Sequence, residues 1–427
     1  MSPADPPREP LSGPDDVPRL RESHPPRTDP PAEVPGALEP PVEIDAAQFR
    51  AATGEDITRV LSLDTWHQGP DLAGVYERLE REVAEAVAQE DEFRDRIRET
   101  VFPVIGSGRT APPCAGVYEA TEADIRMVHE KALFNGGVEA CDGTVAVHDT
   151  LPLTVAQVGV ALVSYAGEQG SWVQRIYHRD VRDRGRNPIE GMLEVLGRRE
   201  RRAGLGRTRQ ADAMSELLSR GLMTYSERAA LLERSHAPWR MGHGQPVPYE
   251  LITGSGSMDL LRESIGVLRE LLLGYRRWVF VPSEPRERML LTLGDALLPR
   301  EFAIIDTMEA RMHDVIEKGH LRGEDRERAW KFYHDAAPRI VIGVYRASKD
   351  VPPYVFYAHV DHAEDAALIA MADSVLQAHR GFPVLIDIAD SVCASAFGAG
   401  GFQATVESAY AARGRPFSYL RERETRE

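Results

Sequence analysis

Cysteine is scarce in this chain. Only three cysteines occur among 427 residues, Cys114, Cys141 and Cys393, and no two of them have a paired spacing. Disulfide-dependent small domains and zinc ribbons both need closely spaced, paired cysteines. The scarcity therefore argues against a disulfide framework and a zinc ribbon, and it fits the reducing environment of the cytoplasm.

Long apolar runs are also missing. No stretch reaches the ~18 uninterrupted apolar residues typical of a membrane-spanning helix, although apolar residues make up 42 % of the chain. The first residues lack the charged, apolar and small-residue regions of a secretory signal peptide. We therefore expect a cytoplasmic protein without a membrane span, with one large domain or two modest ones.

Positive charge is in deficit. The chain has 51 Lys and Arg against 67 Asp and Glu, a formal net charge of −16, and its pI is near 5.4. A free-standing protein that coats DNA non-specifically is usually basic. Any contact with a nucleic acid must therefore use a local basic patch, a bound cation or a partner protein.

Composition divides the chain into four parts. Residues 1–41 contain 13 of the 30 prolines, mixed with charged residues, and this composition predicts a disordered tail because it offers little to bury. An N-terminal helical segment is expected at 42–100, since apolar residues from Leu72 onward recur at the three- and four-residue spacing of an amphipathic helix. We expect the main domain at 101–415 and a short charged tail at 416–427.

The main domain shows strand patterns that first cluster and then alternate with helices. Strands are expected at 138–147, 151–165, 172–178, 246–252, 278–281, 339–345 and 354–360. Helices are expected after Ser257, a typical N-cap residue, and at 363–378. The arginine-rich stretch 179–245 is expected to form helices and loops. This order predicts an α/β fold, a mixed sheet flanked by helices with helical insertions.

One carboxylate stands out within the segment Cys141-Asp142-Gly143-Thr144. A strand would hold Asp142 rigidly, and the glycine would let a phosphate approach the backbone. The alternative is an ordinary hairpin turn, which Asp-Gly also favours. Two-metal phosphodiester cleavage needs several converging carboxylates, and such oxygen ligands suit Mg²⁺ or Mn²⁺ rather than zinc.

The order of four short motifs resembles that of the NurA nuclease family, over roughly residues 100–410. The motifs are Cys141–Thr144, a helix with Glu190 and Glu194, Glu250–Ser255, and Gly381–Asp390. The resemblance implies a ribonuclease-H-like fold and a metal-dependent DNA nuclease. It also implies that Asp142, Glu250 and Asp390 are catalytic, and that these three and Glu194 hold Mn²⁺ or Mg²⁺.

Two positions depart from the family pattern. Thr253 stands where the third motif has Asp, and Glu250 would need a bulge in its strand to replace that residue. The last motif ends in Asp390 rather than His. Each acid also has a structural alternative: Glu250 as a solvent-facing strand residue, Asp390 as a helix N-cap, and Glu194 on an exposed helix face. His359, Asp361 and His362 have zinc-like spacing, but we favour a polar strand end.

A basic cluster follows the predicted strands. Its arginines are Arg198, Arg199, Arg201, Arg202, Arg207 and Arg209. We expect it to bind DNA phosphates; a solvated surface is the alternative. Members of the resembling family work with HerA, a hexameric ATPase that translocates DNA, so the resemblance implies that partner, a homodimer, and DNA end processing in repair or antiphage defence. The chain has no P-loop and is not expected to be the motor. The rival interpretation is a non-catalytic structural adaptor of the translocase.

Overall fold

The computed structural model describes residues 45–67, 73–108, 111–149, 153–179, 193, 216–284 and 288–415. The chain divides into two compact units, Met1–Glu82 and Val83–Glu427, with the division inside a long helix. Both predicted tails, 1–41 and 416–427, lie entirely outside the described residues. The four-part division drawn from composition therefore stays a prediction.

The first unit is helical in its described part. It contains α1 (Ala46–Thr53), α2 (Ile57–Leu61) and the start of α3 (Ala73–Thr100). Asp45 begins α1 with a capping box, because its side chain accepts from the Gln48 backbone while the Gln48 side chain accepts in return. The helix predicted from apolar spacing is α3, but its apolar residues Val75, Leu79, Val83 and Val87 are exposed.

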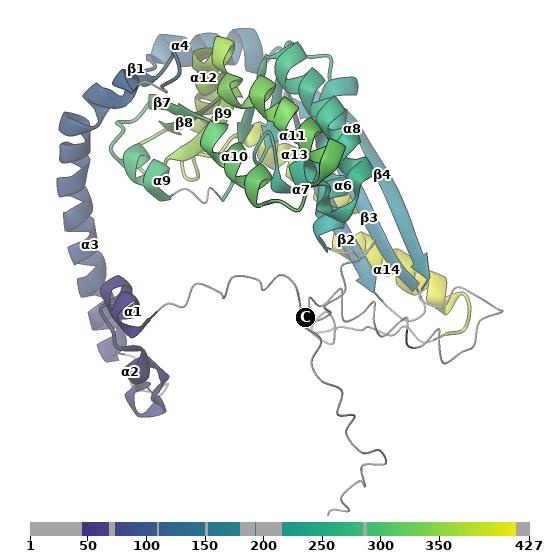
Figure 1. The fold of residues 1–427 in the computed structure, drawn as a ribbon, viewed down its shortest axis with the longest axis horizontal. Coiled ribbons are helices and arrows are strands. Elements are labelled where there is room, and N and C mark those ends of the chain that lie inside the picture. Colours follow the sequence, from purple (N-terminus) through teal and green to yellow (C-terminus); the bar gives the residue numbers. More distant parts are fainter. Residues whose placement is uncertain are drawn as a thin grey trace, which may run out of the picture. The chain divides into compact units, whose positions relative to one another are not determined.

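The second unit is built on one sheet (Figure 1). Its strands are β1 (Gly116–Glu119), β2 (Val138–Asp149), β3 (Leu153–Ser164), β4 (Gly167–Arg179), β5 (Trp239–His243), β6 (Trp278–Val281), β7 (Glu301–Thr307), β8 (Ile340–Arg346) and β9 (Tyr354–His359). Their order across the sheet is β1-β7-β8-β9-β6-β5-β2-β3-β4. The pairs β2–β5 and β5–β6 are parallel, and the remaining neighbours are antiparallel.

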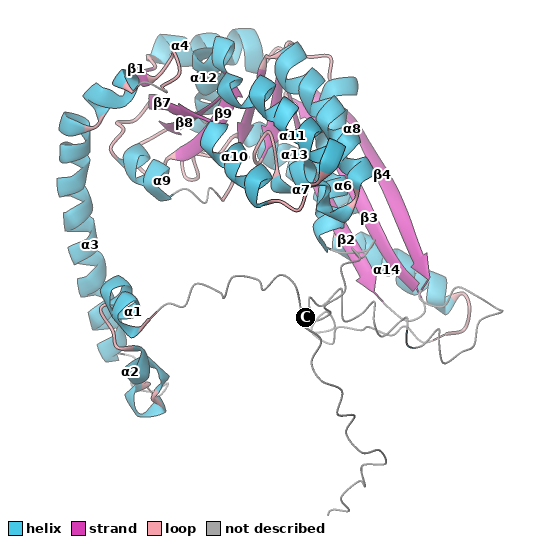
Figure 2. Ribbon diagram, in the orientation of Figure 1, coloured by secondary structure: helices cyan, strands magenta, loops and turns pink. Residues whose placement is uncertain are grey.

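Helices cover both faces of this sheet (Figure 2). They are α4 (Glu122–Val128), α6 (Glu216–Glu233), α7 (Tyr249–Thr253), α8 (Met258–Arg269), α9 (Arg288–Asp295), α10 (Glu309–Lys318), α11 (Gly323–Ala336), α12 (Ala363–Val375), α13 (Val384–Phe397) and α14 (Ala399–Ala411). One core contains residues of α4, α12 and α13; the other contains residues of α6, α7, α8, α10 and α11. The mixed sheet flanked by helices, predicted from the sequence, is confirmed.

Strand β6 shows how the two cores share the sheet. Trp278 and Phe280 belong to the core under α8, whereas Val279 and Val281 belong to the core under α12. All four side chains are fully buried, because a strand in a parallel pair between two helical layers has no face left for water. Its neighbour β5 is buried at its three central residues.

The end of the described chain contains one long apolar stretch. Among the described residues, Val384–Ala411 has the length and composition of a membrane span. It consists of α13 and α14, which are separated by extended backbone at Gly398. Helix α13 packs on β2 and β3 and buries Leu385, Ile386 and Ala389. A helix that covers a sheet meets the same criteria, so the stretch is weak evidence for a span.

Two predicted elements differ in the structure. The prediction of a strand at 246–252 is wrong, because most of this segment belongs to α7. Pro248, with φ −66°, is the N-cap of that helix, and Gly254, with φ 70° in the left-handed region, is its C-cap. Proline at a helix start favours helix over a central strand. Conversely, β5 lies within the stretch 179–245 that was expected to form helices and loops.

Candidate active site

The site begins where β5 stops short of its neighbour β2. The two strands pair only between Val138–Cys141 and Trp239–Gly242, while β2 continues to Asp149 along β3. From Asp142 onward, the edge of β2 that faces β5 has no strand partner in the described part of the chain. We call this gap, beside Asp142 and Gly143, the notch.

Asp142 borders the notch from inside a strand. It pairs with Ala161 of β3, so the hairpin-turn alternative for Asp-Gly is wrong. Its side chain is only 6 % exposed, and the Gly143 backbone N–H donates to its Oδ1 at 2.8 Å. The carboxylate is therefore rigidly placed, as the strand interpretation predicted.

One further side chain, at the end of a parallel strand, reaches Asp142, and a second contacts the first. His243 is the last residue of β5, and its Nδ1 lies 3.2 Å from Asp142 Oδ1. The other ring nitrogen, Nε2, lies 3.0 Å from the hydroxyl of Ser283, which follows the end of β6. Because β5 and β6 run in the same direction, their carboxyl ends bring His243 and Ser283 to the same edge of the sheet.

Glu227 approaches from the opposite face, on α6. Side chains alternate along a strand, and the face of Gly143 points to α6: a Cβ atom there would lie 2.7 Å from Glu227 Oε1 and 2.8 Å from Met223 Cγ. Asp142, its neighbour, points to the other face. The missing side chain of Gly143 thus lets a second acid reach the notch.

Arg228 fixes this arrangement. It is 1 % exposed, and its Nη1 donates to the carboxylate of Glu227. Its Nη2 donates to the backbone carbonyls of His243 at 3.1 Å and Gln245 at 2.5 Å, and its guanidinium lies 5.0 Å from the centroid of the Phe280 ring. One buried cation therefore ties α6 to the end of β5.

The charges around the notch influence one another. Burial raises the pKa of Glu227 above its ordinary value despite the opposing charge of Arg228, and the charge of Asp142 adds to the rise. Burial lowers the pKa of His243, but the hydrogen bond and charge of Asp142 and the charge of Glu227 outweigh it, so that pKa is raised. Burial and the charge of Asp142 also raise the pKa of Asp390.

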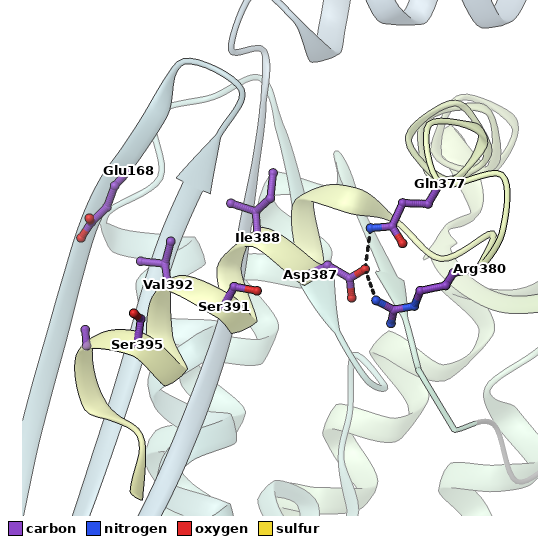
Figure 3. Close-up of a pocket in the computed structure, with 9 residues that line it drawn as sticks. Glu168, Gln377, Arg380, Asp387, Ile388, Ser391, Val392 and Ser395 are labelled. Atoms are coloured by element: carbon purple, nitrogen blue, oxygen red, sulfur yellow. Dashed lines mark hydrogen bonds and ion pairs between the residues drawn. The ribbon is translucent and has the colours of Figure 1, made fainter. Parts of the chain in front are cut away.

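Asp390 lies in the middle of α13, and the N-cap alternative is wrong because Pro383 holds that position. Its side chain is exposed. Asp387, one turn earlier, accepts from Gln377 Nε2 and Arg380 Nη1, both at 2.7 Å, in a groove of about 720 Å³ along α13 (Figure 3). Asp387 is thus held by Gln377 and Arg380, whereas Asp390 is close enough to Asp142 to feel its charge.

Glu250 stands in a cavity of about 530 Å³ that opens beside the notch. The residues that share this cavity include Arg220, Glu227, Arg228, His243 and Ser283. Glu250 Oε1 lies 3.4 Å from Arg220 Nη2. Because Glu250 sits on a helix, the bulge expected from a strand is not needed. Thr253 donates to the Tyr249 carbonyl within the same helix.

The predicted carboxylate metal site of Asp142, Glu250, Asp390 and Glu194 stays a prediction, because Glu194 lies outside the described residues. No group of three or more His, Cys, Asp or Glu side chains that could hold a metal ion occurs among the described residues. Glu227 is engaged by Arg228 and Asp142 by His243. Glu194, the fourth predicted ligand, and the arginine cluster 198–209 lie outside the described residues.

The zinc-like spacing at the end of β9 produces a different structure. His359 is buried, and its Nδ1 accepts from the Asp361 backbone N–H at 3.2 Å. Asp361 Oδ2 lies 3.1 Å from Arg276 Nη1. The segment is a polar strand end, the interpretation favoured from the sequence.

Three residues of the site were not predicted from the sequence: Glu227, His243 and Ser283. One signal for two of them exists. The segments that begin at Trp239 and Trp278 are both short strands that start with Trp and end at a glycine or proline. Reading them as a pair would have placed His243 and Ser283 after neighbouring strand ends.

No protein-family model matches the chain, and no curated protein matches it. Solved structures do. The NurA nuclease from Sulfolobus solfataricus is 11 % identical, with 80 % of this chain and 98 % of that chain covered and a TM-score of 0.42. A NurA structure with manganese is 10 % identical, with 77 % and 98 % covered and a TM-score of 0.35.

Endonuclease V from Ciona intestinalis, in complex with DNA, is 12 % identical, with 74 % and 97 % covered and a TM-score of 0.25. The resemblance to NurA that the sequence motifs indicated is thus found again among solved structures. All three TM-scores lie below 0.5.

Proposed function

We propose that this chain is a nucleic-acid phosphodiester hydrolase, a DNA nuclease whose active site is the notch. One observation carries the proposal. Four ionisable side chains, listed here by element, come to one break in the sheet: Asp142 from β2, Glu227 from α6, His243 from β5 and Asp390 from α13. Perturbed, mutually sensitive carboxyl and imidazole groups beside a cavity are typical of hydrolytic sites.

The side chains suggest distinct roles. Asp142 orients His243 through Nδ1, so that Nε2 can take or return a proton at the reacting oxygen. Arg220, whose side chain is 58 % exposed, offers a guanidinium to a phosphate in the same cavity as His243. Arg228 has its donors turned to Glu227 and to backbone carbonyls, so it supports the site rather than binding a substrate.

The proposal also includes the properties that the resemblance to the NurA family implies for this chain. They are a requirement for Mn²⁺ or Mg²⁺, a HerA-like hexameric ATPase as partner, a homodimer, a cytoplasmic location, and a role in DNA end processing or antiphage defence. The acidic composition supports a partner, because the described cavity offers few cations to a polyanion.

The test is cleavage of labelled DNA by the full chain, with Mn²⁺, Mg²⁺ or EDTA, in the presence and absence of a HerA-like partner. We expect Asp142→Asn to abolish cleavage without unfolding the protein. Asp306→Asn is a matched control, because Asp306 also lies in a strand and also accepts from the next backbone N–H at 2.8 Å. Equal loss in both variants would contradict the assignment of the notch.

The adaptor interpretation is favoured by one observation, the pairing of Glu227 with Arg228, which occupies an acid that a nuclease could use. It predicts a folded protein that binds the translocase but cuts no DNA under any of these conditions. Cleavage that depends on Asp142 would exclude it.

A further inference from the structure

Helix α13 is held at both of its ends by buried side chains from other elements. At its start, Asp373 of α12 accepts from the Leu385 backbone N–H at 2.9 Å and from the Tyr165 hydroxyl at 2.5 Å. At its end, Gln157 of β3 donates through Nε2 to the Phe397 carbonyl at 2.7 Å. Asp373 is 0 % exposed and Gln157 is 2 % exposed. We call these two buried contacts the clamps.

The first clamp completes the start of α13. The first backbone N–H groups of a helix have no partner within the helix, and the N-cap residue, Pro383, makes no side-chain hydrogen bond. Asp373 supplies an acceptor from a different helix, and its negative charge suits the positive end of the helix dipole. Burial raises the pKa of Asp373 to about 6, so at pH 8 the side chain is ionised and can only accept.

The second clamp has a fixed direction. Arg175 Nε donates to Gln157 Oε1 at 2.7 Å, and a guanidinium has only donors, so the Gln157 amide can satisfy Arg175 and the Phe397 carbonyl in one orientation only. The last turn of α13 also lies directly on the strand. A Cβ atom at Gly159 of β3 would be 2.4 Å from Phe397 Cδ2, so the glycine allows this close approach.

Both clamps connect α13 to β3, the neighbour of β2. Tyr165 directly follows β3 and Gln157 lies within it. Midway between them along the chain is Ala161, which pairs with Asp142. Asp142 points away from α6, toward the face of the sheet that α13 covers, and Asp390 lies near the middle of that helix. The clamps therefore fix α13 over the strand pair that carries Asp142.

Packing alone covers only one side of α13. The buried residues of the helix are Leu385, Ile386, Ala389 and Cys393. Side chains of its other side, among them Ser391 and Ser395, line the groove of about 720 Å³ (Figure 3). Apolar contacts are non-directional, so they hold the helix on the sheet without fixing its position along the strand. The hydrogen bonds of the clamps are directional and supply that restraint.

We infer that Asp373 and Gln157 are positioning residues, which fix Asp390 beside Asp142 by holding the two ends of α13 on β3. Their part in cleavage rests on the proposed function; the holding of α13 does not. Neither side chain lines the cavity that contains Arg220, so both act through the helix and neither touches the substrate. The rate of the chemical step should therefore depend on the clamps, and substrate binding should not.

The first test needs no nucleic acid. Cys393 is buried on α13, whereas Cys141 is buried in β2 within the core under α6. Iodoacetamide reaches either thiol only when its surroundings open, and mass spectrometry of peptides gives both rates in one sample. Asp373→Asn and Gln157→Met should each raise the rate at Cys393 relative to Cys141 by about 5–100-fold, because each leaves a buried group unpaired. An unchanged ratio in both variants would overturn the inference.

Glu139→Gln is the matched control. Glu139 is also buried, and it accepts from a backbone N–H, that of His236 at 2.9 Å, but it does not contact α13 through this bond. We expect an unchanged ratio in this variant, and a rise equal to that of the clamp variants would overturn the inference. If Asp373→Asn does not fold, Tyr165→Phe removes one of the two donors to Asp373 and should raise the ratio by a smaller factor.

The second test measures single-turnover cleavage of labelled DNA in Mn²⁺, with the protein in excess. Each clamp variant should lower the rate at saturating protein by about 10–100-fold, while the protein concentration that gives half of this rate stays the same. In Asp390→Asn, whose amide keeps the size of the carboxylate, the same substitutions should cause little further loss, because no carboxylate is left to position.

The outcomes separate this inference from the proposed function. A full further loss in the Asp390→Asn background, or cleavage by both clamp variants at the wild-type rate, would overturn the positioning role while the proposed function stands. A raised reactivity of Cys393 in the clamp variants of a protein that cleaves no DNA would support the holding of α13 and contradict the proposed function.

Discussion

Two histidines close strands of the same sheet and have opposite properties. His243 ends β5 and His359 ends β9, and each has an aspartate oxygen within 3.5 Å of its Nδ1. The pKa of His243 is raised, whereas burial lowers the pKa of His359 to about 4. Since β6 is parallel to β5 and antiparallel to β9, the two rings lie at opposite ends of the sheet.

The difference comes from the aspartates rather than from the histidines. Asp142 is buried and points its charge at His243, so its attraction outweighs the cost of burying the ring. Asp361 is 52 % exposed and lies 3.1 Å from Arg276, so water and a second cation weaken its effect. Nε2 of His359 also has no hydrogen-bond partner among the described residues. An imidazole can exchange protons at neutral pH only in the first setting.

The largest expected effect is the difference in cleavage rate between the variants His243→Asn and His359→Asn. We expect His243→Asn to reduce DNA cleavage by about 10²–10⁴-fold, the usual contribution of a general base. His359→Asn should leave the rate nearly unchanged, because asparagine Oδ1 can accept from the Asp361 backbone as Nδ1 does. Initial rates on labelled DNA provide the measurement, and similar losses in both variants would contradict the different roles.

Removing the buried cation Arg228 should lower the stability of the protein more than removing an exposed arginine. Arg228→Met leaves the buried carboxylate of Glu227 without its partner, and at pH 8 this should lower the free energy of unfolding by about 3–5 kcal/mol. Arg269→Met is the control, since its pair with Asp335 is about 40 % exposed on both sides and should cost less than about 1 kcal/mol. Urea unfolding measures the loss of unfolding free energy in both variants. Equal losses would contradict a stabilising role specific to the buried Arg228.

The stability of the wild-type protein should fall on acidification because of His359. The folded ring stays neutral until pH about 4, while the unfolded ring takes up a proton near pH 6.5, so below that pH the unfolded state binds more protons. At pH 5, 1.5 units lower, the contribution is about 2 kcal/mol. The difference in unfolding free energy between wild type and His359→Asn should change by this amount between pH 7 and pH 5; a constant difference would contradict it.

Much of the fold could be predicted because its strands are continuous apolar runs. The long run from Leu153 to Ser164 is β3, and the pair predicted at 339–345 and 354–360 is β8 and β9. Ser257 caps α8 as expected, with its side chain accepting from Leu260. In each case the signal is local, because periodicity and capping residues act within a few positions of one another.

Strands β1, β5 and β7 were missed for physical reasons. Strand β5 has five residues, and Arg240, the second of them, makes it look polar. That arginine is buried because its guanidinium stacks 3.4 Å from the centroid of the Tyr275 ring, a contact between distant segments. Short strands whose polar residues are covered by tertiary contacts carry no periodic signal of their own.

The site was predicted in part. Asp142 was singled out correctly as a rigid strand carboxylate, and Glu250 shares a cavity with the notch. Their roles remain predictions. Glu227 has no signal in the sequence, and the notch that brings it near His243 exists only because β5 is shorter than β2. Strand length and register are set by the whole sheet, so a gap between two strands is invisible along the sequence.

The positions of the site residues along the chain determine when the site forms during folding. Its parts lie at Asp142, Glu227, His243, Ser283 and Asp390, so the notch is complete only after the last major helix has packed. Contacts between such distant residues form late in folding, because closing long loops costs entropy before any contact repays it. A chain still emerging from the ribosome would carry Asp142 long before α13 exists. The proposed active site is therefore incomplete in the nascent chain until its synthesis is almost finished.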